Sequence, residues 1–255
     1  MYNFCIKADQ SLAESFENQI HACGRLLINN IETDDRIDGE PLFAMSGKTI
    51  EQYRRLLVQF NKKIVLLDCS APLADAEQYR QAFRKAHLLG VENIRVEPGA
   101  AAEGPDPGSL PAGLAEILKI GRSYGIGVVL ENGRGSRLDG GKPIAALLRQ
   151  ASAAQPGLIF NPLEFAATGR HPFFHVFYSC RWKSNIGFLR VNDGLFRDGS
   201  QVMPGQGNAE IKEMASALLA RSFRGYFSFC PYLAGMNEDA YGEVIDRFKA
   251  LLLAM

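Results

Sequence analysis

Polar residues that could take part in chemistry stand at the ends of several short apolar runs in this sequence. Glu97 and Glu131 each follow such a run, Asn161 and Cys230 do the same later in the chain, and Arg190 lies inside one. A carboxylate at the end of a buried strand costs free energy unless it is paired or bound to a ligand. Two interpretations therefore stay open from the sequence: a ligand site, or a structural ion pair.

The histidines are weaker candidates. His171 and His175 are four residues apart, so on a helix they would share a face and could hold a metal. However, His171 precedes Pro172, which is typical of the start of a helix. We interpret the pair as structural, and we keep His171 as a candidate for contacting a ligand. Lys7, near the end of the first apolar run, is a further candidate.

The segment 131–143 invites comparison with a phosphate-binding loop. A P-loop has two glycines separated by four residues, followed by Lys and then Ser or Thr. Here Ser136 holds the first glycine position, and Pro143 follows Lys142. The sequence also contains no GxGxxG motif for a dinucleotide and no HExxH motif for zinc. We expect a flexible loop at this place.

Eight short apolar runs alternate with longer segments of helical period, and these elements must position the candidate residues. The runs are rich in β-branched and aromatic residues, as is typical of parallel strands buried on both faces. The longer segments carry apolar residues at i, i+3, i+4 and i+7, which predicts helices laid on a sheet. The expected strands are 4–6, 26–28, 64–67, 94–96, 128–130, 158–160, 188–191 and 226–229.

Alternation of strands and helices predicts parallel neighbours with right-handed crossovers. An open doubly wound sheet is the alternative, but a repeat of roughly thirty residues and a count of eight favour a closed (β/α)8 TIM barrel. No linker divides the chain, so we predict a single α/β domain over residues 1–255. The Pro/Gly-rich stretch 97–111 falls in a loop after the fourth strand, where the functional loops of a barrel lie.

Charge and cysteine content limit the class of protein. Twenty-eight Lys and Arg balance twenty-eight Asp and Glu, which argues against nucleic acid and anionic membranes as partners. The five cysteines are widely spaced with no CxxC pair, as expected in a reducing compartment. No signal peptide or bilayer-spanning run is present in the sequence. We expect a cytoplasmic protein with a small-molecule partner, and we leave its oligomeric state open, with a homodimer as one alternative.

Several segments, taken in chain order, resemble the xylose isomerase-like barrel family, which includes sugar-phosphate isomerases and epimerases. The resemblance runs over nearly the whole chain and is more specific for fold than for activity. It implies a divalent cation at the barrel top, held by Glu, Asp, His and Glu on strands 5 to 8, with two glutamates exchanging a proton with the sugar. The segments that carry it are LGVENIRVEPG (89–99), VLEN (129–132), FNP (160–162), LRVNDG (189–194), PGQG (204–207) and GYFSFC (225–230).

Most of the metal ligands that the family uses are replaced here. Glu131 is retained at the strand 5 position, but Asn161, Arg190 and Cys230 stand at the other three, and Glu97 stands where the family often has His. One carboxylate and an amide beside a guanidinium would hold a cation poorly. We therefore expect no cofactor. Strands 5 and 7 share parity, so we hypothesise that Arg190 replaces the cation and pairs with Glu131.

These expectations predict a sugar isomerase/epimerase-like barrel that binds a small carbohydrate or polyol at its mouth, without a metal and with altered or lost catalysis. If catalysis survives, we expect Glu131 as the base and Arg190 as the electrophile. One alternative is an isomerase or epimerase that uses Mn, Mg or Zn with a modified ligand set; another is a non-enzymatic scaffold or regulatory protein. The candidate substrate-binding residues are Lys7, Glu97, Asn161, His171, Gly205, Gly207 and Cys230.

Overall fold

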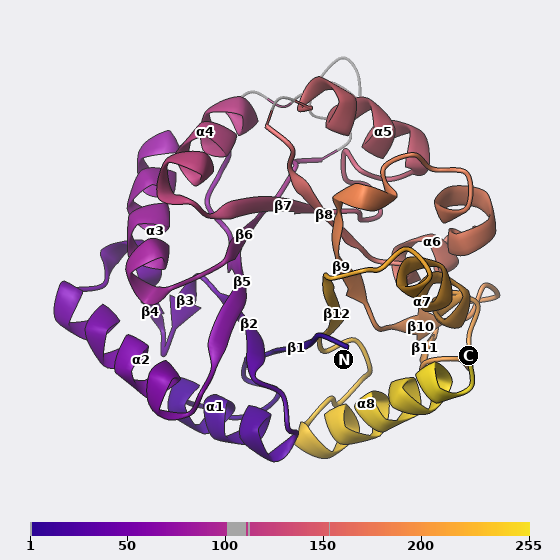
Figure 1. Ribbon diagram of the computed structural model, residues 1–255, viewed down its shortest axis with the longest axis horizontal. Helices are drawn as coiled ribbons and strands as arrows, with labels where there is room; N and C mark the ends of the chain where they lie inside the picture. Colours follow the sequence, from indigo (N-terminus) through magenta and orange to yellow (C-terminus); the bar gives the residue numbers. More distant parts are fainter. Residues whose placement is uncertain (1, 101–110, 112, 153) are drawn as a thin grey trace.

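Eight parallel strands form a closed barrel, and the helices form a ring around it (Figure 1). The computed structural model describes residues 2–100, 111, 113–152 and 154–255. The predicted (β/α)8 TIM barrel is confirmed. In their order around the barrel the strands are β1 (Phe4–Lys7), β2 (Asn30–Asp34), β5 (Lys63–Cys69), β6 (Asn93–Val96), β7 (Gly127–Glu131), β8 (Gly157–Phe160), β9 (Ile186–Arg190) and β12 (Tyr226–Phe229), which pairs with β1.

The helices cover the outside of the barrel and bury the apolar stripes that the sequence shows. Tyr79, Phe83 and Phe248 are among the fully buried side chains of this outer core. Among the described residues, no helix is both long enough and apolar enough to cross a bilayer. The helices are α1 (Phe16–Arg25), α2 (Gly47–Gln59), α3 (Ala76–Leu89), α4 (Leu114–Tyr124), α5 (Gly141–Gln150), α6 (Leu163–Ala166), α7 (Ile211–Leu219) and α8 (Glu238–Leu253).

Two short hairpins extend the loops that follow β2 and β9. One pairs β3 (Arg36–Ile37) with β4 (Glu40–Pro41), and the other pairs β10 (Asp193–Gly194) with β11 (Gln201–Val202). Both lie beyond the carboxyl ends of barrel strands, where the loops of a TIM barrel form its ligand site. In the Pro/Gly-rich stretch predicted as a functional loop, residues 101–110 lie outside the described residues.

The barrel interior has an apolar layer below a charged layer. Alternate residues of each strand point inward, so residues two apart on one strand occupy successive layers. Glu131 lies two positions beyond Val129 on β7, and Arg190 lies two positions beyond Phe188 on β9. The charged layer therefore lies at the carboxyl ends of the strands. The apolar layer is a cluster separate from the outer core: Cys5, Val65, Leu66, Val129, Ile159 and Phe188.

The second strand was expected at 26–28, and that prediction is wrong. Leu26 caps the end of α1, and Leu27 is 85% exposed in a left-handed conformation with φ of 59°. The strand β2 begins at Asn30 and has the polar sequence NIETD. Its central residue, Glu32, is fully buried inside the barrel. With this inward charge the strand contains no apolar run, so the apolar pattern could not locate it.

Candidate functional site

Arg190 lies at the end of β9 with only 4% of its side chain exposed. Every N–H group of its guanidinium donates a hydrogen bond to another side chain. Nε and Nη2 donate to the two carboxylate oxygens of Glu131 at 3.1 and 3.0 Å. Nη2 donates to Glu32 Oε1 at 2.9 Å, and Nη1 donates to Glu32 Oε2 and to Ser228 Oγ, the latter at 2.7 Å. A guanidinium has five donors, so this arrangement leaves none for a ligand.

Glu131, at the end of β7, is held by cations and an amide. Besides Arg190, its Oε2 lies 3.0 Å from Arg95 Nε, and its Oε1 accepts a hydrogen bond of 2.9 Å from Asn161 Nδ2. Burial alone would raise the pKa of Glu131, but Arg190, Arg95 and Asn161 lower it to about 2. The carboxylate therefore stays ionised, with both oxygens occupied.

Ion pairs continue from Glu131 across the mouth of the barrel. Arg95 Nη1 donates to Asp68 Oδ1 at 2.5 Å, and Arg95 Nη2 donates to Glu97. Lys7 Nζ lies 2.7 Å from Asp34 Oδ1 and 3.4 Å from Asp68 Oδ2. Three cations and five carboxylates give a net charge of −2. We call this set the mouth network: Lys7, Glu32, Asp34, Asp68, Arg95, Glu97, Glu131 and Arg190.

The carboxylates of the mouth network raise the pKa values of its buried cations. For Lys7, burial by itself lowers the pKa, but the nearby Glu32, Asp68 and Asp34 carboxylates raise it above its ordinary value. For Arg190, burial again opposes the charge, and Glu131 and Glu32 raise the pKa well above the ordinary value. The cations of the mouth network are therefore permanently charged at neutral pH.

An amide chain supports the network from the side of β8. Asn161 Oδ1 accepts a hydrogen bond of 2.9 Å from Asn192 Nδ2, and the backbone of Asn161 is bound at both its N–H and its carbonyl by Asn132, at 2.8 Å each. Asn192 is buried, and its Oδ1 has no hydrogen-bond partner among the described residues. This acceptor is enclosed by protein atoms, and within the described part of the chain it stays unpaired beside the network.

Cys230 follows β12 and belongs to the same region, since Arg190 and Glu32 both act on it electrostatically. Burial raises the pKa of the Cys230 thiol to about 11, and Arg190 only partly opposes this rise. A thiol with so high a pKa is a poor nucleophile at neutral pH. The geometry therefore gives Cys230 no support as a nucleophile, and it leaves contact with a ligand as a prediction.

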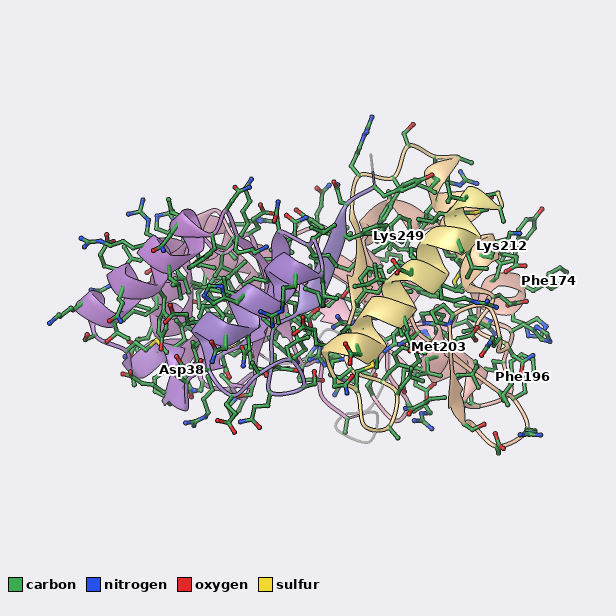
Figure 2. All side chains as sticks on the ribbon, turned by 90° about the horizontal axis from the view of Figure 1, so that it is seen from below. Asp38, Phe174, Phe196, Met203, Lys212 and Lys249 are labelled. Carbon is green, nitrogen blue, oxygen red and sulfur yellow. The ribbon has the colours of Figure 1, made fainter. Side chains whose placement is uncertain are left out.

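The remaining predicted residues form a second group. Gly205 N and Gly207 N donate to Asp193 Oδ2 at 2.8 and 2.9 Å, and His171 Nδ1 lies 3.1 Å from Glu210 Oε1 with its ring against Phe196. In the part of the chain that the structure describes, these contacts do not reach the mouth network. In Figure 2, Phe196 lies at the outer edge of the molecule, on the side opposite Asp38.

Asp193 gives the turn at 204–207 a structural explanation. Its carboxylate accepts from the backbone N–H groups of Gly194, Gly205, Gly207 and Ala209. A Cβ on Gly207 would stand 2.3 Å from Asp193 Oδ1. The glycine is thus needed for the carboxylate to approach the backbone. Its contact with a substrate stays a prediction.

The donor set at the mouth does not fit a divalent cation. At the positions where the resembled family holds its metal, Glu131 already binds Arg190 and Arg95, and a guanidinium within 3.1 Å of both carboxylate oxygens would repel a dication. Among the described residues, no group of three or more His, Cys, Asp or Glu side chains is arranged to hold a metal. The contact hypothesised between Glu131 and Arg190 is present.

Sequence reasoning missed the partners that complete the network. Glu32 and Asp34 were overlooked because their strand was placed four residues too early. Asp68 and Arg95 lie in strands that were correctly located. Asp68 is one residue beyond the apolar run of its strand, and Arg95 lies inside the run of the next. A search for charged residues two apart would have found Glu32 with Asp34 and Arg95 with Glu97, but not Asp68.

Comparison with known proteins identifies the fold. No protein-family model matches the sequence, and no curated protein matches it. Solved structures do match over nearly the whole of both chains. A xylose isomerase domain protein from Salmonella typhimurium LT2 is 18% identical with a TM-score of 0.76, covering 98% of this chain and 97% of its own.

Two further solved structures are similar to the same extent. The IolI protein, whose structure holds a zinc atom, is 15% identical with a TM-score of 0.77, and the match covers 99% of this chain and 97% of IolI. An L-ribulose 3-epimerase is 12% identical with a TM-score of 0.76, and the match covers 100% of this chain and 95% of the epimerase. The chain therefore has the fold of the xylose isomerase-like TIM barrels.

Proposed function

We propose that this protein is a carbohydrate-binding barrel of the sugar isomerase and epimerase kind, which binds a small uncharged sugar or polyol at its mouth without a divalent metal. The observation that carries the proposal is the buried Arg190, whose guanidinium binds both Glu131 and Glu32 through four hydrogen bonds. A fixed organic cation takes the position that a metal has in the resembled family. The likeness to a sugar epimerase supports the kind of ligand.

The charge of the mouth favours an uncharged ligand. The mouth network carries a net charge of −2, so a sugar phosphate or sugar acid would be repelled. Hydroxyl groups donate and accept hydrogen bonds, and they can therefore bind exposed carboxylates such as Asp34 and Glu97. Asp34 is 47% exposed and Glu97 is 55% exposed.

Two grooves beside the network offer room for the ligand. One of about 700 Å³ is lined by Asp34, Thr33 and Ser11 among other residues, and one of about 480 Å³ is lined by Glu97 and Ser70. Both lie between loops that follow barrel strands, at the end where TIM barrels bind their ligands. The polar side chains that line the larger groove, among them Asp34, Thr33 and Ser11, suit a hydroxyl-rich molecule.

The same geometry disfavours the proton exchange of the resembled family. A general base works best with a pKa near the working pH, whereas the pKa of Glu131 is lowered to about 2 by its cationic neighbours against the effect of burial. Arg190 has no free donor with which to stabilise a developing charge. We therefore assign both residues to the fixed floor of the site and not to catalysis.

A ligand screen tests the proposal. Ketohexoses, aldopentoses, cyclic polyols and the corresponding sugar phosphates are screened by thermal shift and confirmed by calorimetry, once with EDTA and once with Mn²⁺. We expect at least one uncharged compound to bind equally well under both conditions. Binding that needs Mn²⁺, binding by phosphorylated sugars alone, or no binding by any compound would each refute the proposal.

A matched pair of variants locates the site. Asp34→Asn removes a mouth carboxylate that is half exposed, and Asp246→Asn makes the same change in an exposed ion pair with Lys249 on α8. We expect the first variant to weaken binding of the uncharged compound by about tenfold, because a hydrogen bond to a charged group is lost. The second variant should bind as the wild type does.

A further inference from the structure

A groove of about 760 Å³ opens at the end of the barrel opposite the mouth, where β9 and β12 begin. Two segments line it, 180–187 before and at the start of β9, and 218–225 between α7 and β12. We call it the basal groove. It shares no lining residue with the grooves at the mouth.

The basal groove is lined by charges of one sign. Arg181, Lys183, Arg221 and Arg224 contribute four cations, and none of the described residues that line the groove is acidic. The side chains of Arg181, Arg221 and Arg224 are exposed and form no ion pair with a carboxylate of the described residues. Four like charges around one groove repel one another, and an anion between them would relieve that repulsion.

The cations do not have a sufficient explanation in the fold alone. Arg221 lies just beyond the carboxyl end of α7, where the helix dipole stabilises a cation. This accounts for one of the four charges. Lys183 is held in place by the protein, since its Nζ donates to the carbonyls of Tyr178 and Cys180 at 2.9 and 2.7 Å. The helix dipole and the hydrogen bonds of Lys183 do not explain the charges of Arg181 and Arg224.

A serine adds a hydroxyl at a place that usually favours glycine. Ser222 lies in the turn after α7 in a left-handed conformation with φ of 59°. The turn is closed by hydrogen bonds from Ser222 N to Leu219 O and from Phe223 N to Leu218 O. Glycine is the usual residue at this position of a helix cap. Ser222 and Ser184 both line the groove and provide donors beside the cations.

We propose that the basal groove binds a small anion that carries phosphoryl groups, at a site separate from the carbohydrate site of the mouth. The guanidinium of arginine has a planar fork of donors that matches the oxygens of a phosphoryl group. The volume of the groove falls in the range of small-molecule sites. Ile186, Leu218 and Phe223 also line it, so the carbon skeleton of a phosphorylated molecule would find apolar contacts.

Calorimetric titration of the full chain with pyrophosphate, at constant ionic strength, tests the proposal. We expect saturable binding that sulfate at the same ionic strength does not reproduce. The double variant Arg181→Gln/Arg224→Gln should weaken pyrophosphate binding by about tenfold or more, because charge-assisted hydrogen bonds are lost. Both side chains are exposed, so the variant should fold. Hydrogen exchange should show protection by pyrophosphate within 218–225.

A matched control separates a site from a general effect of charge. Arg84→Gln/Arg149→Gln removes the same charge from exposed positions on α3 and α5, outside the groove, and it should bind pyrophosphate as the wild type does. Equal weakening by the two double variants, or no saturable binding by the wild type, would overturn the proposal. Much tighter binding of a single-stranded oligonucleotide through Arg181 and Arg224 would also overturn it, in favour of a nucleic-acid surface. None of these outcomes bears on the mouth, which the sugar screen tests.

Discussion

The guanidinium of Arg190 pairs with the carboxylates of Glu32 and Glu131 deep in the barrel, and hydrogen bonds fix their positions. A buried ion pair of this kind contributes little net stability compared with an apolar core, because removing the charges from water costs free energy. Losing one partner is different, since the remaining charge stays buried without compensation. Arg190 is thus a residue on which the whole charged layer depends.

Replacing Arg190 with Met tests this dependence. Arg190→Met leaves Glu32 fully buried with its guanidinium partner removed, and we expect the free energy of unfolding at pH 7 to fall by about 3–5 kcal/mol. Urea denaturation measures the loss. Arg80→Met, which removes the exposed pairs with Glu77 and Glu116, should cost about 1 kcal/mol or less. Similar losses in the two variants would contradict the assignment of Arg190 to a buried network.

At the scale of elements, the loop after β9 is organised by a single carboxylate. Asp193 stands in β10 directly after the barrel strand, and it binds the backbone of the 204–207 turn and the start of the segment that leads to α7. The turn that resembles a substrate loop is therefore shaped by a protein anion. Gly205 and Gly207 donate their backbone N–H groups to Asp193, which explains the shape of the turn without a ligand.

Replacing Gly207 with Ala tests the role of the turn. The new Cβ would lie 2.3 Å from Asp193 Oδ1 and 2.6 Å from Gly194 O, so the carboxylate or the backbone must move. We expect a loss of about 1–3 kcal/mol in the free energy of unfolding. Gly47→Ala is the matched control, because a Cβ there meets nothing within 4 Å. A neutral effect of Gly207→Ala would show that the turn is not held in this way.

For the whole molecule, the balance of charges predicts how stability depends on pH. The folded pKa of Glu131 is lowered to about 2, against 4.5 as its ordinary value, mainly by Arg190 acting against the effect of burial. A depressed folded pKa contributes stability above the unfolded pKa, and that contribution is lost as the pH falls. The window therefore runs from about pH 4.5 down to about pH 2.

Acid unfolding of the wild type and of Glu131→Gln measures this contribution. We expect the difference in unfolding free energy between the two proteins to be largest at neutral pH. It should shrink by on the order of 3 kcal/mol as the pH is lowered through that window. Urea denaturation at a series of pH values provides the comparison. A difference that is constant with pH would mean that Glu131 does not titrate as its contacts require.

The architecture was largely open to prediction from the sequence. Apolar runs located seven of the eight barrel strands, and helical periodicity identified the buried faces of α3, α7 and α8. These signals are local, because burial on both faces of a strand or on one face of a helix is written into neighbouring residues. The fifth and seventh barrel strands are both odd-numbered, so their inward side chains share a layer. This was enough to predict that Glu131 and Arg190 would meet.

The composition of the charged layer was decided only by the tertiary structure. Glu32 comes from 158 residues before Arg190, and its strand is too polar to be recognised as a buried element. Which carboxylate meets which guanidinium depends on how the strands are staggered around the closed barrel, a property of the whole sheet. The same closure determined that Arg190 would have every donor taken. Local sequence thus determined where most of the strands lie. Long-range register determined which inward side chains meet and which of them remain available to a ligand.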